Sequence, residues 1–275
     1  MKVTVIGANG MLGYAVSEYF KNTGHDVQAL TRSTFDIAND TFNKFEKLVT
    51  AHNSDVVINC AGVIKPMIAK TKIEDVLKVN SVFPHNLGKF AVASKLKIFH
   101  ITTDCVYSGL KGKYDETDMY DATDVYGMSK NAGEPTNLMT LRTSIIGEEK
   151  GEGRSLLAWA ISQKGKEVNG FTNHSWNGVT TVKLAQAIDD IIKTNQYTPG
   201  LFHMHSPDSP TKLELLKMFN ETYELNLKIN ATEAKDLCDR TMTTKHKFAS
   251  TFIKESIPEQ IKMMRKFFME VNKTK

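Results

Sequence analysis

Apolar and polar positions alternate along residues 1–150 in a pattern that predicts strands and helices in turn. Short apolar runs, of the kind buried on both faces of a sheet, alternate with stretches whose apolar residues recur at helical spacing. The predicted strands are Lys2 to Ile6, Val27 to Leu30, Asp55 to Asn59, Lys97 to Ile101 and Leu138 to Thr143. The predicted helices are Met11 to Lys21, Val76 to Ala93 and Asp124 to Gly133. This order predicts an α/β fold with a doubly wound parallel sheet of the Rossmann type.

The pattern becomes less regular after Gly147. The polar, glycine-rich stretch from Glu148 to Gly153 predicts a crossing to a second region. Further helices are predicted over Thr180 to Lys193, Pro210 to Tyr223 and Pro258 to Val271, and a strand over Gly200 to Met204. We expect residues 1–150, joined by the returning stretch 177–204, to form the sheet, and residues 151–176 and 205–275 to form a smaller, mostly helical cap at its carboxyl edge.

Composition narrows the class of protein. The chain has 275 residues, 41% of them hydrophobic, which is enough for a substantial core. Its 35 basic and 31 acidic side chains leave a net charge of +4 without a long block of one sign, so a nucleic-acid partner is not expected. The three cysteines have no CxxC spacing, so neither a metal site nor a disulfide framework is predicted. We expect a cytoplasmic protein with no signal peptide and no membrane span.

Three glycines, Gly7, Gly10 and Gly13, follow the first strand and open the first helix. The first allows a tight turn, the second lets the backbone approach a pyrophosphate, and the third lets the helix pack against its strand. This arrangement predicts a dinucleotide-binding turn. Arg32 follows the second strand, where an acidic residue would otherwise hold the ribose. An arginine suits a 2′-phosphate, which favours NADPH, although NADH and a solvated surface role for Arg32 both stay open.

A tyrosine and a lysine lie one helical turn apart, at Tyr126 and Lys130. Reduction of a ketone needs a proton donor at the carbonyl oxygen, and a phenol with an ordinary pKa near 10 is a poor one at neutral pH. We expect the Lys130 ammonium to lower the pKa of Tyr126 and to hold the nicotinamide ribose. Thr103 ends the fourth strand, where its hydroxyl would orient the carbonyl. These three residues are the predicted catalytic set of an NAD(P)-dependent oxidoreductase.

Six motifs of the chain resemble those of the extended short-chain dehydrogenases/reductases, and within them the dTDP-4-dehydrorhamnose reductase family. They are Gly7-Ala-Asn-Gly-Met-Leu-Gly13, Asn59-Cys-Ala-Gly62, Thr102-Thr-Asp-Cys-Val-Tyr107, Tyr126-Gly-Met-Ser-Lys130, Leu141-Arg-Thr-Ser144 and Trp176-Asn-Gly-Val-Thr180. The resemblance implies the same catalytic set and a nucleotide-diphosphate sugar as substrate. It also implies that Ala61 and Gly62 line the cofactor, that Asp36 and Ile37 lie near its adenine, and that Arg240 is directed at the substrate.

Fifteen residues are expected to bind the cofactor. They are Gly7, Asn9, Gly10, Met11, Leu12, Gly13, Arg32, Asp36, Ile37, Cys60, Ala61, Gly62, Thr102, Tyr126 and Lys130. The expected substrate-binding residues are Cys105, His174, Trp176 and Arg240. For Trp176, stacking on a nucleotide base and closing a core both stay open.

The leading hypothesis is NADPH-dependent reduction of the 4-keto group of a nucleotide-linked 4-keto-6-deoxy sugar, for the synthesis of surface polysaccharide sugars. A first alternative adds epimerisation. GDP-fucose synthase, a related extended reductase, similarly places a cysteine two positions after its catalytic hydroxyl, as Cys105 follows Thr103, and His174 would be its partner here. A second alternative is a non-catalytic regulatory subunit with the same fold. A homodimer is a further possibility.

Overall fold

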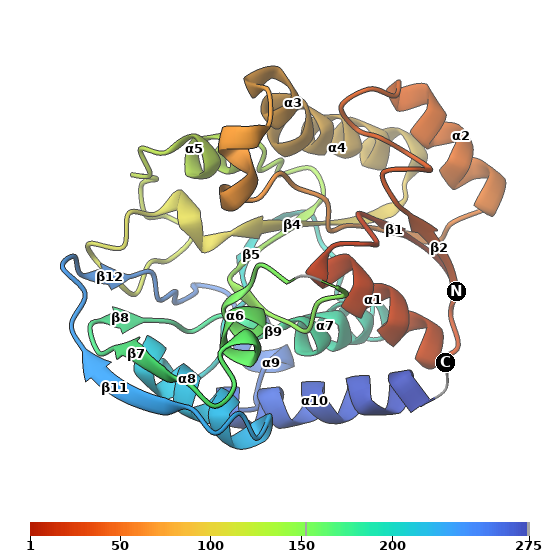
Figure 1. Cartoon of the computed structure of the whole chain (residues 1–275). Helices are drawn as coiled ribbons and strands as arrows, with labels where there is room; N and C mark the ends of the chain where they lie inside the picture. The colour runs from red at the N-terminus through yellow and green to blue at the C-terminus, as the bar shows by residue number, and fades with distance from the viewer. Residues whose placement is uncertain (152, 274–275) are drawn as a thin grey trace.

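Six parallel strands form one large sheet in the computed structural model, which describes residues 1–151 and 153–273 (Figure 1). Their order is β10-β5-β4-β3-β1-β2. The bounds are β1 Lys2–Ile6, β2 Asp26–Leu30, β3 Val56–Asn59, β4 Lys97–Thr103, β5 Met139–Thr143 and β10 Gly200–His203. The predicted doubly wound parallel sheet is confirmed. β10 pairs with β5, so the chain returns to the sheet late in the sequence.

Helices cover both faces of this sheet (Figure 1). One face carries α1 (Met11–Asn22) and α7 (Thr181–Lys193), which pack on each other, and α10 (Ile257–Lys273) packs against α7. The other face carries α2 Phe42–His52, α3 Ile73–Leu77, α4 Phe83–Ser94 and α5 Val125–Asn131. Because both faces are covered, the inner strands β3 and β5 are buried throughout, whereas the edge strand β2 is mostly half-buried.

Two features of the second face differ from the predictions. The helix expected from Val76 to Ala93 lies within one helical stretch, but a π-helical segment that was not predicted, η2 (Lys78–Val82), lies between α3 and α4. The Asn80 side chain in this segment turns inward and hydrogen bonds to the backbone of Val63. Helix α2 was not predicted. Only Phe45 and Val49 are buried on it, which is too few apolar positions for a clear periodic signal.

Short elements lie beside the carboxyl ends of the large sheet's strands, on the left in Figure 1. They are α6 Leu156–Ser162, β7 Glu167–Phe171, β8 His174–Ser175, α8 Lys212–Thr222, β11 Lys228–Thr232 and β12 Cys238–Asp239. Strand β11 pairs with β7, and β12 pairs with β8. A third short pair joins β6 (Ile145–Ile146) to β9 (Val179–Thr180), and α9 (Phe248–Phe252) precedes α10.

These short strands were not part of the mostly helical cap that the sequence predicts. Runs of two to five residues carry too little periodicity to be distinguished from loops. The stretches 151–176 and 205–275 expected to form the cap also contain residues 152, 274 and 275, which lie outside the described residues.

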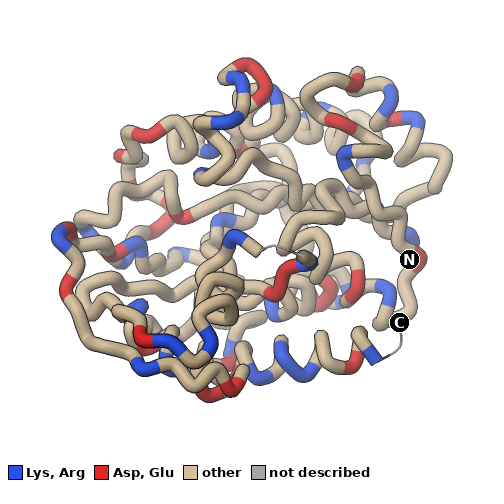
Figure 2. The backbone as a smooth tube through the Cα atoms, in the orientation of Figure 1, with Lys and Arg blue, Asp and Glu red and all other residues tan. Residues whose placement is uncertain are grey.

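The surface charge is mixed. Figure 2 shows basic and acidic residues interspersed over the molecule, and basic residues predominate along α10. Within the part of the chain that the structure describes, no helix is both long and apolar enough to cross a membrane.

Candidate active site

The turn between β1 and α1 is packed so closely that side chains do not fit at two of its glycines. Gly7 has a φ of 77°, and a Cβ there would lie 2.8 Å from the Ala61 Cα. A Cβ on Gly13 would lie 2.2 Å from the carbonyl oxygen of Gly7. The turn therefore packs directly against Ala61, two residues after the end of β3. Gly10 is the capping residue of α1, so no side chain caps the first backbone N–H groups of the helix, which is typical of an anion-binding helix start.

This turn lies at the switch point of the sheet. The chain leaves β1 toward one face through α1 and leaves β3 toward the other face through α3 and α4 (Figure 1). Open α/β sheets bind ligands in the crevice outside the strand ends at such a point. Gly62 follows β3, and a Cβ there would lie 3.8 Å from the Lys130 Nζ atom. Gly7 therefore lies against Ala61, and the next residue, Gly62, lies beside the predicted catalytic lysine.

The residues predicted near the adenine end follow β2. The N–H groups of Gly7 and Ala8 donate to the Leu30 carbonyl, which brings the glycine turn beside the end of β2. Arg32 is exposed two residues farther on. Asp36 accepts hydrogen bonds from Ala38 and Asn39, and Ile37 packs against the apolar cluster of this face. Asn9 is exposed, Met11 half-buried and Leu12 buried in the core.

Thr103, Tyr126 and Lys130 come together at the carboxyl end of β4. Tyr126 lies beside Thr103, whose side chain lowers the pKa of the Tyr126 hydroxyl. Lys130 is only 4% exposed, and its ammonium donates to the Ile101 carbonyl oxygen at 3.2 Å. Helix α5 approaches the short 3-10 turn η3 (Asp104–Val106) so closely that a Cβ on Gly127 would lie 2.4 Å from the Cys105 carbonyl oxygen. The contact of α5 with η3 therefore sets the spacing of the three side chains.

The electrostatics of this set differ from the expectation in one respect. The pKa of Tyr126 is raised above its ordinary value, firstly by burial and then by the neighbouring Cys105, while the hydrogen bond from Thr103 lowers it. The expected lowering by Lys130 is therefore not seen. Burial lowers the pKa of Lys130 to about 8, partly offset by Glu134. At neutral pH the lysine is charged and the phenol keeps its proton, so Tyr126 is in the form that can donate one.

Asn80 is a site residue that the sequence reasoning missed. Its side chain accepts from the Val63 N–H at 2.8 Å and donates to the Val63 carbonyl oxygen at 3.0 Å. The same amide donates to the Ser129 hydroxyl on α5 at 3.1 Å. Asn80 therefore holds the loop after β3 and the catalytic helix in one arrangement. The sequence carries little signal for it, because Lys78 and Ser81 are polar residues of the same stretch.

Cys60 and Thr102 lie in the strand ends between the crevice and the core. Burial raises the pKa of the Cys60 thiol, and the side chain packs against the apolar cluster under the sheet. Among the described residues, the buried Thr102 hydroxyl has no hydrogen-bond partner. A buried hydroxyl without a partner is uncommon and fits a position that faces a polar ligand.

The pairing of Cys105 with His174 does not form. The His174 ring bonds to the Asp236 carbonyl at 2.9 Å and packs on Phe171 rather than meeting the thiol. Burial, and then the adjacent Asp104, raise the pKa of Cys105 to about 12. A base that removes a proton next to a ketone needs the opposite shift.

Trp176 closes a core and does not offer a stacking face. It is 6% exposed and packs in the apolar cluster that includes Leu216 and Ile261. Its indole N–H donates to the Ser144 hydroxyl at 2.8 Å. The structure therefore supports the alternative in which Trp176 closes a core.

Arg240 is brought to the catalytic end of β4 by the segment after β12. Its Nε donates to the Tyr107 carbonyl oxygen at 2.7 Å. Gly109 has a φ of 90° and backs onto this side chain, since a Cβ there would lie 3.1 Å from the Arg240 Cγ. Arg240 interacts electrostatically with Cys105 and Asp104, which directly follow Thr103.

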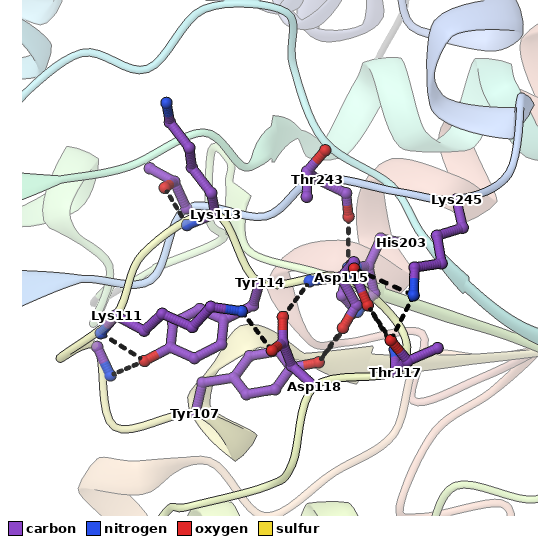
Figure 3. A network of polar contacts seen from close by, with 12 residues as sticks. Tyr107, Lys111, Lys113, Tyr114, Asp115, Thr117, Asp118, His203, Thr243 and Lys245 are labelled. Carbon is purple, nitrogen blue, oxygen red and sulfur yellow. Dashed lines mark hydrogen bonds and ion pairs between the residues drawn. The ribbon is translucent and has the colours of Figure 1, made fainter.

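A buried polar network, part of which Figure 3 shows, fastens this segment to the large sheet. The fully buried Arg142 on β5 donates to the Tyr107 hydroxyl and to His203 Nε2, and pairs with Glu134. The other His203 ring nitrogen bonds to the Thr243 carbonyl at 2.8 Å. Burial, reinforced by Arg142, lowers the pKa of His203 to about 4. A neutral histidine therefore links β10 to the chain that carries Arg240.

The fold and these side chains define an α/β protein of the extended short-chain dehydrogenase/reductase type. The glycine turn, the switch-point crevice and the Thr103, Tyr126 and Lys130 set lie together at one sheet edge. The chain belongs to the RmlD substrate binding domain family, whose family model matches residues 1–246.

Relatives of known name agree with this assignment. The chain is 35% identical over 136 residues to a dTDP-4-dehydrorhamnose reductase of Mycolicibacterium smegmatis, a match that covers 48% of this chain and 40% of that protein. It is 31% identical over 147 residues to the reductase of the same name from Aggregatibacter actinomycetemcomitans, covering 53% and 49%. The match to the Bacillus subtilis spore coat polysaccharide biosynthesis protein SpsK is 26% identical and covers 74% and 72%. The chain thus spans about half the length of the reductases it matches.

Solved structures show the same fold along the whole chain. A dTDP-4-dehydrorhamnose reductase from Clostridium acetobutylicum superposes with a TM-score of 0.79 at 20% identity, covering 98% of this chain and 100% of that one. A Bacillus anthracis dTDP-4-dehydrorhamnose reductase in complex with NADP gives a TM-score of 0.80 at 21% identity, covering 98% and 99%. At such identities the likeness concerns the fold.

Proposed function

We propose that this protein reduces the 4-keto group of a nucleotide-diphosphate-linked 4-keto-6-deoxy sugar, with NADPH as the hydride donor. The observation that supports this most strongly is the joint placement of Thr103, Tyr126 and Lys130 beside the glycine-lined crevice. The names of the relatives, and the Bacillus anthracis structure with NADP, point to the same substrate class and cofactor.

The residues present fit a dinucleotide. Gly7 and Gly13 let the turn pack closely against Ala61 and on itself, Gly62 lies beside Lys130, and the Thr102 hydroxyl faces no protein partner among the described residues. The glycine turn and the amino terminus of α1 would hold the pyrophosphate, and Arg32 would meet a 2′-phosphate. When bound, NADPH supplies a hydride to the ketone carbon.

The remaining chemistry belongs to side chains of this protein. Tyr126 donates its proton to the carbonyl oxygen as negative charge develops there, and Thr103 holds that oxygen by a hydrogen bond. Lys130 stays charged at neutral pH and provides a donor for the ribose beside the reacting ring. The glycine-lined crevice positions the reactants, which lowers the entropic part of the barrier.

The test uses purified protein, NADPH and a panel of nucleotide-linked 4-keto-6-deoxy sugars, followed by the absorbance of reduced nicotinamide. We expect oxidation of NADPH with at least one of them and a reduced sugar in the product. Absence of turnover with every ketone, under conditions where NADPH binds, would contradict the proposal and favour a non-catalytic subunit. Epimerisation is not proposed, because His174 and Cys105 are not paired.

Three further predictions from the sequence are carried into the proposal. They are a cytoplasmic location, a homodimer, and a division into residues 1–150 with 177–204 and residues 151–176 with 205–275. The mixed surface charge supports an aqueous location (Figure 2). Cell fractionation, sedimentation of the purified protein and limited proteolysis test the three in turn.

A further inference from the structure

His100 is a fully buried histidine on β4 to which no motif assigned a role. It lies directly across from Asn59 of β3 in the parallel register, so the two side chains emerge on the same face of the sheet. Asn59 is also fully buried, and it opens the motif that contains Ala61 and Gly62. The histidine is therefore the neighbour of the residue from which the expected cofactor loop starts.

Two hydrogen bonds link the His100 ring to the backbone of this loop. The Asn59 Nδ2 atom lies 3.0 Å from His100 Nδ1, and the Asn59 Oδ1 atom accepts from the Ala61 N–H at 3.2 Å. Because a backbone N–H can only donate, the Asn59 atom that meets it must be the oxygen. The amide nitrogen then donates to His100, so Nδ1 is the acceptor and the ring proton is on Nε2. The direction of each bond in this chain is therefore fixed.

The surroundings of the ring agree with this neutral form. Burial, and then the charge of Lys130 on α5, lower the pKa of His100 well below its usual range; the Gly133 backbone partly offsets this, and His85 of α4 adds to it. A protonated ring would turn a second donor toward the Asn59 amide nitrogen. Within the part of the chain that the structure describes, Nε2 has no hydrogen-bond partner. The contact of Nδ1 with Asn59 is therefore the polar contact that accounts for a histidine at this position.

The Ala61 N–H lies where the glycine turn meets the loop after β3. A Cβ on Gly7 would lie 2.9 Å from the Ala61 nitrogen, so the turn packs against this peptide group without spare room. A Cβ on the next residue, Gly62, would lie 3.8 Å from Lys130 Nζ. Rotation of the Asn59 amide would release the Ala61 N–H and let the loop shift between these two neighbours. In a close-packed region such a shift changes the shape of the crevice.

We propose that His100 is a positioning residue of the cofactor crevice, because it holds the Asn59 amide in the orientation that fixes the Ala61 N–H. This inference rests on the cofactor part of the proposed function. Since His100 is wholly buried, it acts through Asn59 and Ala61 and not on the cofactor itself. An apolar side chain at position 100 would leave the Asn59 amide nitrogen buried without its acceptor, which favours a different orientation of the amide.

The test compares two variants that have nearly the same shape. In His100→Asn the side-chain oxygen takes the place of Nδ1 and accepts from Asn59, whereas His100→Leu carries a methyl group there. Both variants lose the same outer atoms of the ring, so the cavities that they leave are alike. Weaker cofactor binding by the Leu variant than by the Asn variant therefore reports the missing acceptor.

NADPH affinity of the full-length protein is measured by calorimetry, without any sugar nucleotide. His100→Leu should weaken NADPH binding by about threefold to tenfold, and His100→Asn should restore most of the affinity. In the free protein, the Ala61 amide should exchange its hydrogen faster in the Leu variant than in the Asn variant. The control for the loss of a buried histidine is His25→Leu, at the amino end of β2, where His25 Nε2 lies 3.3 Å from Asp189. It should lower stability and leave NADPH affinity unchanged.

Kinetics separate this inference from the proposed function. With a keto sugar that is turned over, His100→Leu should raise the KM for NADPH and change kcat little. If the wild type binds NADPH but turns over no ketone, while the Leu variant alone loses affinity, the positioning role stands and the proposed reaction fails. Equal NADPH affinity in the Leu and Asn variants would show that the inference is wrong, even where turnover is normal.

A further variant covers the case in which His100→Leu does not fold. His100→Gln then replaces it, because the polar atoms of glutamine lie one bond farther out and do not occupy the place of Nδ1. The Gln variant should bind NADPH more weakly than the Asn variant. Equal affinity of these two variants would overturn the proposal.

Discussion

The two sides of the candidate active site are built in different ways. The chemical side, with Thr103, Tyr126 and Lys130, stands on one long strand and one helix of the large sheet. The recognition side, with Arg240, stands on the segment that follows a two-residue strand. The first is positioned by regular backbone and close-packed glycines, and the second by a buried polar network. A site of this kind can keep its reaction while its substrate contacts vary, because loops tolerate change and the sheet does not.

The largest effect should come from removing the proton donor on the chemical side. Tyr126→Phe should lower kcat by about a hundredfold to ten-thousandfold, the usual contribution of a positioned general acid. NADPH affinity should be almost unchanged, because only the hydroxyl is lost. Stopped-flow or steady-state oxidation of NADPH with the active keto sugar measures this, with Tyr19→Phe on α1 as the control. Full turnover in Tyr126→Phe would overturn the assigned role.

The next effect comes from replacing glycines by alanine. It should distinguish the cost of close packing at the crevice from the cost of a left-handed backbone. Gly7 and Gly24 have φ angles of 77° and 82°, but a Cβ meets Ala61 at the first and nothing within 4 Å at the second. Gly24→Ala should cost about 1–2 kcal/mol of stability through its left-handed backbone. Gly7→Ala should cost a further ~1–3 kcal/mol from overpacking and should also weaken NADPH binding. Urea unfolding and NADPH titration measure both, and equal behaviour of the two variants would disprove close packing at the crevice.

A third experiment tests the network that joins the two sides. His203 has a folded pKa of about 4, below the value near 6.5 expected when unfolded. Between these values the unfolded chain binds the extra proton, so stability is full above pH 6.5 and is lost as the pH falls toward 4. The full loss corresponds to about 3 kcal/mol. Urea midpoints at neutral and mildly acidic pH should fall more in the wild type than in His203→Gln. His246→Gln, on the exposed part of the same segment, should retain the wild-type slope.

The smallest effect concerns the charge of the Lys130 ammonium, and it tests the role of this residue on the chemical side. Its pKa of about 8 means that the ammonium is charged below that pH and neutral above it. We expect kcat/KM to be level below pH 8 and to fall by about tenfold for each pH unit above it, if the charge is needed. Tyr126 does not interfere, because its own pKa is raised. Lys130→Arg should lose this fall, and a level wild-type profile up to pH 10 would refute the assignment.

Local sequence patterns predicted the residues of the chemical side, because these residues lie close together in the sequence. Tyr126 and Lys130 are one helical turn apart, and the glycine turn lies between one strand and one helix. Helix α2 and the short ladders escaped detection because two buried residues, or strands of two to five, carry little periodic signal. The π-helical segment within the helix expected over Val76 to Ala93 was not predicted, because its Asn80 side chain bonds to groups in two other segments.

The sequence by itself determined the parallel sheet and predicted the dinucleotide turn and the candidate catalytic set, since these rest on patterns over short stretches of the chain. Only the tertiary structure decided what surrounds them. It placed Trp176 in a core, held His174 away from Cys105, and brought Arg240 to the Tyr107 carbonyl across more than a hundred positions. Burial and charge pairing depend on which distant segments meet, and no short pattern in the chain specifies that.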